Sequence, residues 1–90
     1  MGVSLFVDFK TDRGVVVEYT VVLLWAAPIG TETIRVYDSA HGFNEMHRCT
    51  RQGGKRVGTE FHSGSLGEGM RSAIEDIKWS YVEMIEGWDR

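Results

Sequence analysis

The longest apolar run in the chain, Val15–Ala27, has the composition of a buried β-strand. It is rich in β-branched and aromatic residues, and only Glu18 and Thr20 within it are polar. Such residues favour strands, and a strand that is apolar on both faces belongs inside a sheet that is covered on both sides. We therefore interpret Val15–Ala27 as the central strand and expect a cover over each of its faces.

Shorter segments of alternating apolar and polar residues predict further strands: Val3–Phe9, Glu32–Asp38, Glu45–Arg51 and Arg56–His62. The pair Gly53-Gly54 between the last two is typical of a two-residue hairpin turn, because such a turn needs positive φ at both central positions. If these glycines close the hairpin, His47 lies opposite Glu60.

The end of the chain predicts one amphipathic helix over residues 65–88. Ser65 and Glu68 have the spacing of a capping box, in which each side chain accepts a hydrogen bond from the other residue's backbone. At 100° per residue, the apolar side chains fall within an arc of about 120°. They are Leu66, Met70, Ala73, Ile74, Ile77, Tyr81, Met84, Ile85 and Trp88. Trp79 lies outside the arc, either as an isolated exposed side chain or as part of a partner surface.

Together these elements predict a single α+β domain over residues 1–90. Residues 1–62 form a four- to five-stranded antiparallel meander sheet, and the long C-terminal helix packs on one face of it. One helix covers one face only, so the second apolar face of the central strand needs another cover. A second copy of the chain is the most economical cover, and we predict a homodimer through this second sheet face.

Composition is that of an ordinary folded domain, with 42% hydrophobic and 26% charged residues in 90. No apolar run is long enough to span a membrane, and the N-terminus lacks the features of a signal peptide. The one cysteine, Cys49, excludes an internal disulfide. We therefore expect a cytoplasmic protein without membrane association.

The charge of the chain is unevenly distributed. The formal net charge of −3 argues against broad nonspecific binding to nucleic acid, yet residues 47–56 contain four basic residues and no acid. These four residues could bind the phosphates of RNA, with Tyr37 as a surface on which a base stacks. Basic residues beside a hairpin also protect a sheet edge from pairing, and both interpretations stay open. The four are Arg48, Arg51, Lys55 and Arg56.

The candidate catalytic residues are Asp38, His47, Glu60 and His62. A carboxylate beside a histidine raises its pKa and fixes its tautomer, which suits acid–base chemistry near neutral pH. The same pair also occurs as an ordinary cross-strand contact on a solvated sheet face. The spacing of Asp38, His41, His47 and His62 matches no compact zinc motif, so we expect neither a metal nor another cofactor.

At these residues the chain resembles a group of short uncharacterised bacterial proteins and, more distantly, the TumE-type toxins of bacterial toxin–antitoxin pairs. The matching positions are Tyr37-Asp38, after an apolar strand, followed by His41, His47 and His62. The resemblance implies a small sheet-plus-helix toxin that acts on or binds RNA and is inhibited by a separate antitoxin protein.

Two functions follow. The first is a toxin-like protein with metal-independent, ribonuclease-like activity. His47 and His62 would then act as acid and base, with Glu60 or Asp38 as the orienting carboxylate and Arg48 and Arg51 on phosphate. The second is a noncatalytic homodimeric protein-interaction module that works through the second sheet face and Trp79. Whether the chain is an enzyme stays open at this level.

Overall fold

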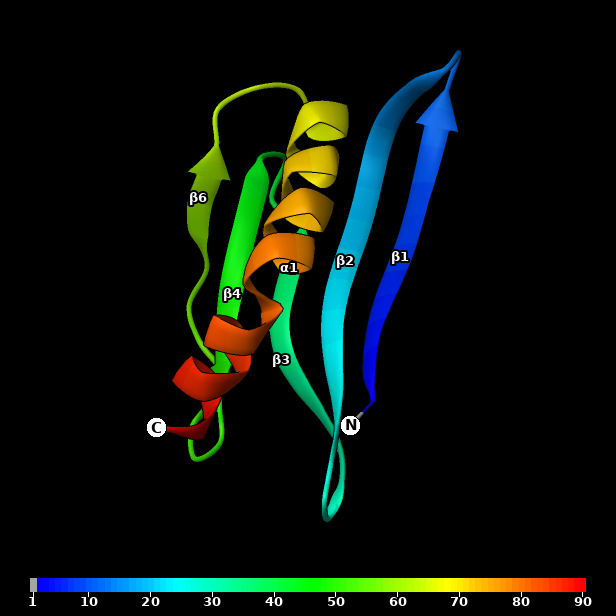
Figure 1. Cartoon of the computed structure of the whole chain (residues 1–90). Helices are drawn as coiled ribbons and strands as arrows, with labels where there is room; N and C mark the ends of the chain where they lie inside the picture. Colours follow the sequence, from blue (N-terminus) through cyan, green and yellow to red (C-terminus); the bar gives the residue numbers. More distant parts are fainter. Residues whose placement is uncertain (1) are drawn as a thin grey trace.

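A sheet carrying one long helix on one of its faces makes up the computed structural model, which describes residues 2–90 (Figure 1). Strands β1 to β4 follow one another as antiparallel neighbours, and β4 also pairs with β5 and β6. The prediction of an antiparallel meander followed by one C-terminal helix is therefore confirmed. The elements are β1 (Val3–Asp12), β2 (Val15–Ala27), β3 (Gly30–Asp38), β4 (Asn44–Thr50), β5 (Gly54–Lys55), β6 (Thr59–His62) and α1 (Leu66–Asp89).

Strand β2 has the predicted bounds, and tight turns join it to its neighbours. Arg13 and Gly14 connect β1 to β2 with φ values of 52° and 81°, and positive φ at both positions is what a primed hairpin turn requires. At the other end, Ala27 pairs with Gly30 across a turn of Pro28 and Ile29. Short turns keep β1, β2 and β3 side by side in the order of the sequence.

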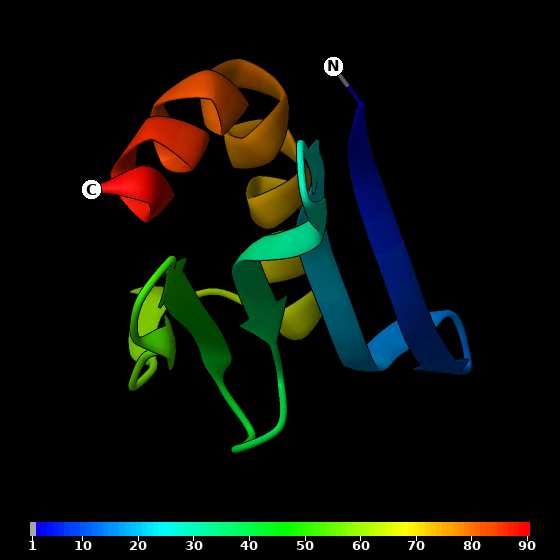
Figure 2. The same ribbon diagram turned by 90° about the horizontal axis from the view of Figure 1, so that it is seen from below.

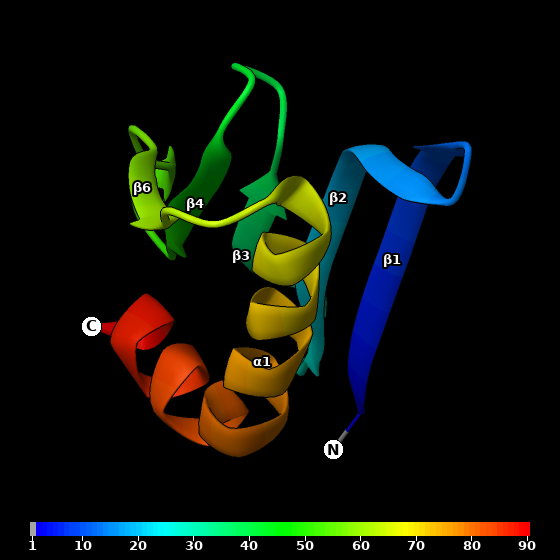
Figure 3. The ribbon, with the colours of Figure 1, turned by 90° about the horizontal axis from the view of Figure 1, so that it is seen from above.

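One face of β2 is buried against α1. Tyr19, Val21 and Leu23 are at most 2% exposed and belong to the same cluster as Ala73 and Ile77 of the helix. Figures 2 and 3 show the sheet curving around the helix. Alternation along the strand places these three side chains on one face, which the helix covers.

Helix α1 begins with the predicted capping box. The Ser65 hydroxyl accepts a hydrogen bond from the Glu68 N–H at 3.2 Å, and the Glu68 carboxylate accepts one from the Ser65 N–H at 2.9 Å. The bond from the Ser65 backbone holds the pKa of Glu68 below its usual range. Within residues 2–90, no helix is both long and apolar enough to cross a membrane.

The outer side of α1 agrees with the helical pattern, with one exception. Trp79 is 82% exposed, as predicted, and its indole N–H donates to Glu75. Tyr81 was expected inside the buried arc but is 39% exposed. The helix packs on β2, β3, β4 and β6. Strand β1 forms the edge of the sheet, next to β2 (Figure 1). Within residues 2–90, therefore, α1 covers only part of one sheet face.

Asn44, at the start of β4, joins the sheet to the segment before α1. Its side-chain oxygen accepts a hydrogen bond from the Tyr19 hydroxyl at 2.8 Å. Its side-chain nitrogen lies 3.0 to 3.2 Å from the carbonyl oxygens of His62, Gly64 and Ser65. Asn44 is itself 1% exposed, and its amide is the partner of the buried Tyr19 hydroxyl and of part-buried carbonyl groups.

Replacing Asn44 with alanine should lower the free energy of unfolding by about 2–3 kcal/mol, because a buried hydroxyl and several carbonyls lose their partner. Denaturant unfolding followed by circular dichroism measures this loss. Gln52→Ala removes a similar amide from an exposed turn and should change stability by less than about 0.5 kcal/mol. Equal effects of the two substitutions would contradict the role assigned to Asn44.

Candidate functional site

Strands β3 and β4 bring Asp38, Glu45 and His47 together. Asp38 lies opposite Glu45 in the β3–β4 register, and Val36 lies opposite His47. Opposite residues share a face and successive residues alternate, so all three polar side chains lie on the same face. Tyr37, between Val36 and Asp38, donates to Asp76 of α1 at 2.9 Å. The three side chains, called here the Asp38–Glu45–His47 cluster, therefore lie on the face away from the helix.

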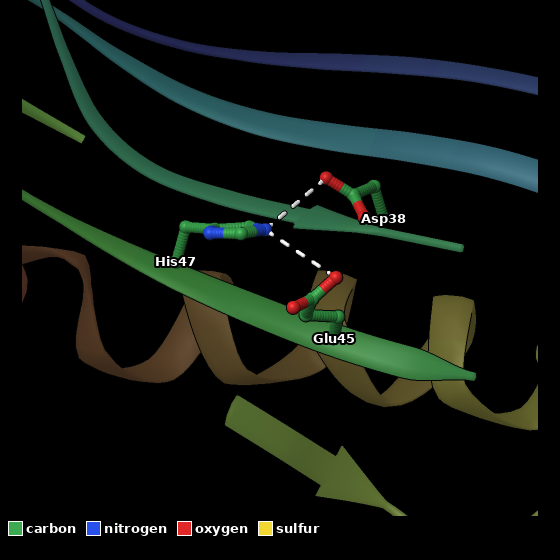
Figure 4. Close-up of side chains that lie close together, drawn as sticks. All are labelled: Asp38, Glu45 and His47. Atoms are coloured by element: carbon green, nitrogen blue, oxygen red, sulfur yellow. Dashed lines mark ion pairs between the residues drawn. The ribbon is translucent and has the colours of Figure 1, made fainter. Parts of the chain in front are cut away.

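Figure 4 shows the three side chains pointing toward one another. The Nε2 atom of His47 lies 3.6 Å from Asp38 Oδ2 and 3.6 Å from Glu45 Oε1, which is too far for a good hydrogen bond to either. The Nδ1 atom lies 2.9 Å from the carbonyl oxygen of Arg56. A carbonyl only accepts, so Nδ1 carries a proton, and in the neutral ring the Nε2 lone pair points at the two carboxylates.

The cluster is buried although it lies on the helix-free face. Asp38, Glu45 and His47 are 8%, 6% and 8% exposed. Asp38 Oδ1 accepts a hydrogen bond from the Ala40 N–H at 3.1 Å, and Glu45 Oε1 lies 2.6 Å from His41 Nδ1. The bond to His41 holds the pKa of the Glu45 carboxyl below its usual range. Buried carboxylates are costly unless they are paired, which marks this cluster as the first candidate site.

The predicted pairing of His47 with Glu60 is wrong. Glu45 lies opposite Glu60 in the structure, and Met46 lies opposite Thr59. The cause is the turn: Gly54 has φ of 65° and pairs with Thr50 in β5, so Gly53 and Gly54 are not the two central residues of the hairpin. A segment of residues 56–58 then separates β5 from β6 and shifts the register.

His47 and His62 are not brought into one site. His62 lies at the end of β6, opposite Asn44, and its Nδ1 accepts a hydrogen bond from the Gly64 N–H at 3.0 Å. Of the four predicted catalytic residues, Asp38 and His47 lie together in the cluster, and Glu60 lies opposite its third member, Glu45. The acid–base pair of two histidines therefore has no geometric basis.

The predicted phosphate-binding residues have different surroundings. Arg51 forms an ion pair with Asp89 at 2.9 Å. Arg48 and Arg56 line one groove of about 450 Å³, together with Met46, Thr50, Val57 and Thr59. Lys55 is exposed in β5, opposite Cys49. The four basic residues thus have separate surroundings, except that Arg48 and Arg56 line one groove.

Tyr37 offers no ring face to a nucleic-acid base. It is 1% exposed, and its ring packs edge to face on Phe61 at a centroid distance of 4.9 Å. Burial raises the pKa of Tyr37 to about 12. Its position in the core follows from the register, in which Tyr37 lies opposite the fully buried Val21.

The sequence argument missed Glu45 as a site residue. Glu45 is two residues before His47 on a strand, and this i, i+2 spacing already places both on one face. Arg35 lies directly opposite Arg48 in the β3–β4 register, which only the strand pairing reveals.

The chain matches no family model, curated protein or solved structure.

Cys49 does not have the surroundings of an activated nucleophile. It is 7% exposed, and burial raises the pKa of its thiol, while the positive charges of Lys55 and Arg35 act in the opposite direction. A raised pKa leaves less thiolate at any given pH.

Iodoacetamide should therefore alkylate Cys49 in the folded protein more slowly than it alkylates a free cysteine peptide. The pH profile of the reaction should also move to higher pH, because deprotonation of the thiol needs a higher pH. Mass spectrometry of quenched samples measures the rate, with the urea-unfolded chain as control. A folded-state rate equal to that of the peptide would contradict this description.

Proposed function

We propose that the chain works as a homodimeric interaction module whose two copies join through their β1 strands. The observation that carries the proposal is the exposure of β1. This ten-residue strand has β2 as its only strand neighbour in the described part of the chain. Leu5, Phe6 and Phe9 are 37%, 53% and 51% exposed, although all three are large and apolar.

An edge strand of this kind needs a partner strand. One side of its backbone has unpaired N–H and C=O groups, and natural proteins protect such edges with charges, prolines or short strands. Residues 3–7 of β1 contain neither a charge nor a proline. Because its apolar side chains are also exposed, β1 has the properties of a strand that pairs with another chain.

A second copy of the same chain fits this edge. Two identical strands pair antiparallel about a two-fold axis perpendicular to the sheet, which keeps equivalent side chains on the same face. With the axis through Val7, Leu5 of each copy lies opposite Phe9 of the other. Apolar side chains then meet across the interface, and the two sheets form one continuous sheet.

The edge is a better interface than the second sheet face expected from the sequence. Val22, Leu24 and Val36 lie on that face, and all three are already half-buried by their neighbours. Phe6, which is 53% exposed, also lies on that face and belongs to β1 itself. Pairing of β1 strands would also cover this part of the second face.

Light scattering coupled to size exclusion should give twice the mass of one chain for the unmodified protein. Leu5→Lys and Phe9→Lys should each shift the equilibrium toward monomer by at least tenfold, because Leu5 and Phe9 lie opposite each other in the proposed dimer and a charge there lies among apolar side chains. Ile29→Lys is the matched control, since Ile29 is 89% exposed in the β2–β3 turn. A monomeric unmodified protein, or a dimer that resists both substitutions, would refute the proposal.

A second function, RNA binding by a toxin-like protein, is favoured by the arginines on β3 and β4. Arg35 and Arg48 lie directly opposite each other, and neither forms an ion pair within residues 2–90. Arg35 Nε is buried without a hydrogen-bond partner. Like charges in opposite positions destabilise a sheet, so an anion such as an RNA phosphate would stabilise this arrangement.

For this second function, Arg48→Gln and Arg56→Gln should each weaken binding to single-stranded RNA. Each should also reduce the slope of log affinity against log salt concentration by about one, as expected for one lost phosphate contact. Fluorescence anisotropy at several salt concentrations measures both quantities. Arg71→Gln, an exposed arginine on α1, is the control and should leave the slope unchanged. Equal slopes for all variants would remove the support for RNA binding.

A further inference from the structure

We propose that the Asp38–Glu45–His47 cluster binds a divalent first-row transition-metal ion, such as Zn²⁺, through one nitrogen and two oxygen ligands. The sequence spacing predicts no metal, because the three ligands come from two strands that meet only in the folded sheet. The proposal is independent of dimer formation and of RNA binding.

The distances within the cluster are those between ligands of one shared ion. His47 Nε2 lies 3.6 Å from each of the two carboxylate oxygens, and all three atoms lie within 4.8 Å of one another. With metal–ligand bonds of about 2.1 Å and tetrahedral angles, two ligands are about 3.4 Å apart. The two separations from Nε2 exceed a hydrogen-bond distance and are close to this value, so side-chain shifts that bring the two carboxylates together would complete the site.

His47 is oriented as metal-binding histidines usually are. Its Nδ1–H donates to the carbonyl of Arg56, and such a backbone acceptor fixes the ring and directs the other nitrogen at the metal. The side chain is only 10% exposed, and within residues 2–90 its one hydrogen bond is the bond through Nδ1. Nε2 of this nine-tenths buried side chain thus makes no hydrogen bond and points between two carboxylates at 3.6 Å from each.

The charges of the cluster also favour a cation. Asp38 and Glu45 are buried side by side, and in the described part of the chain neither forms an ion pair with a lysine or an arginine. Two carboxylates buried side by side repel each other, and a divalent ion between them neutralises their charge. Ala40 and His41 hold the carboxylates from outside by hydrogen bonds, as outer-shell residues do.

Room for the carboxylates depends on Gly58. A Cβ atom built at this position would collide with the Glu45 side chain, so the glycine lets the segment of residues 56–58 pass close to the cluster. The same segment supplies the carbonyl of Arg56 that orients His47. Three protein ligands leave a fourth position open, and a metal-bound water there would have a pKa well below that of bulk water.

Competition between the full-length protein and a chromophoric chelator measures Zn²⁺ affinity and stoichiometry. The unmodified protein should bind one Zn²⁺ per chain, and its Tm should rise with Zn²⁺ concentration. His47→Ala and Asp38→Asn should each weaken binding at least tenfold. Asp38→Asn keeps the shape of the side chain, so it tests the proposal even if His47→Ala does not fold. His62→Ala is the control, because His62 lies outside the cluster, and it should bind as tightly as the unmodified protein.

Several results would overturn the proposal. One is the absence of stoichiometric Zn²⁺ binding. The cluster would then hold a proton between His47 and the carboxylates in place of a metal ion. Another is binding that survives Asp38→Asn but is lost in His62→Ala, which would identify a surface histidine as an adventitious ligand. Mg²⁺ competing equally with Zn²⁺ would exclude a site built around the histidine nitrogen.

Discussion

One helix is narrower than the sheet that it packs on, and this difference in width determines most of the structure. An α-helix with its side chains is about 10 Å across, and strands are about 4.8 Å apart, so one helix covers roughly two or three strands. Helix α1 packs mainly on β2, β3 and β4 and leaves β1 at the edge. The exposed apolar strand and the helix-free face that contains the cluster both follow from this limit.

The sequence predicts elements well where a single strong pattern operates. The bounds of β2 follow from a long and mostly apolar run, and the start of α1 follows from a capping box that local residues complete by themselves. The predicted β4–β6 register is wrong because two adjacent glycines allow more than one type of turn. Only Gly54 of the pair has positive φ, and a change of turn shifts every pairing beyond it.

The candidate site is less predictable than the fold, for a physical reason. Asp38 and His47 stand out by residue type, but burial decides their chemistry, and burial depends on the path of residues 56–58. Glu45 attracts no attention in the sequence, because a glutamate on a strand is usually solvated. His62 belongs to the same residue class as His47, yet its hydrogen bond to Gly64 places it beside the start of α1. Residue type therefore identifies candidates, and strand pairing selects among them.

Asn44 and Glu45 are neighbours, and this adjacency connects two parts of the molecule. Asn44 holds the segment before α1 by its hydrogen bonds, while Glu45 belongs to the buried cluster on the opposite face. Because these are successive residues of one strand, a shift of the backbone here moves both side chains. A backbone movement of β4 at these two residues therefore changes the buried cluster and the hydrogen bonds before α1 together.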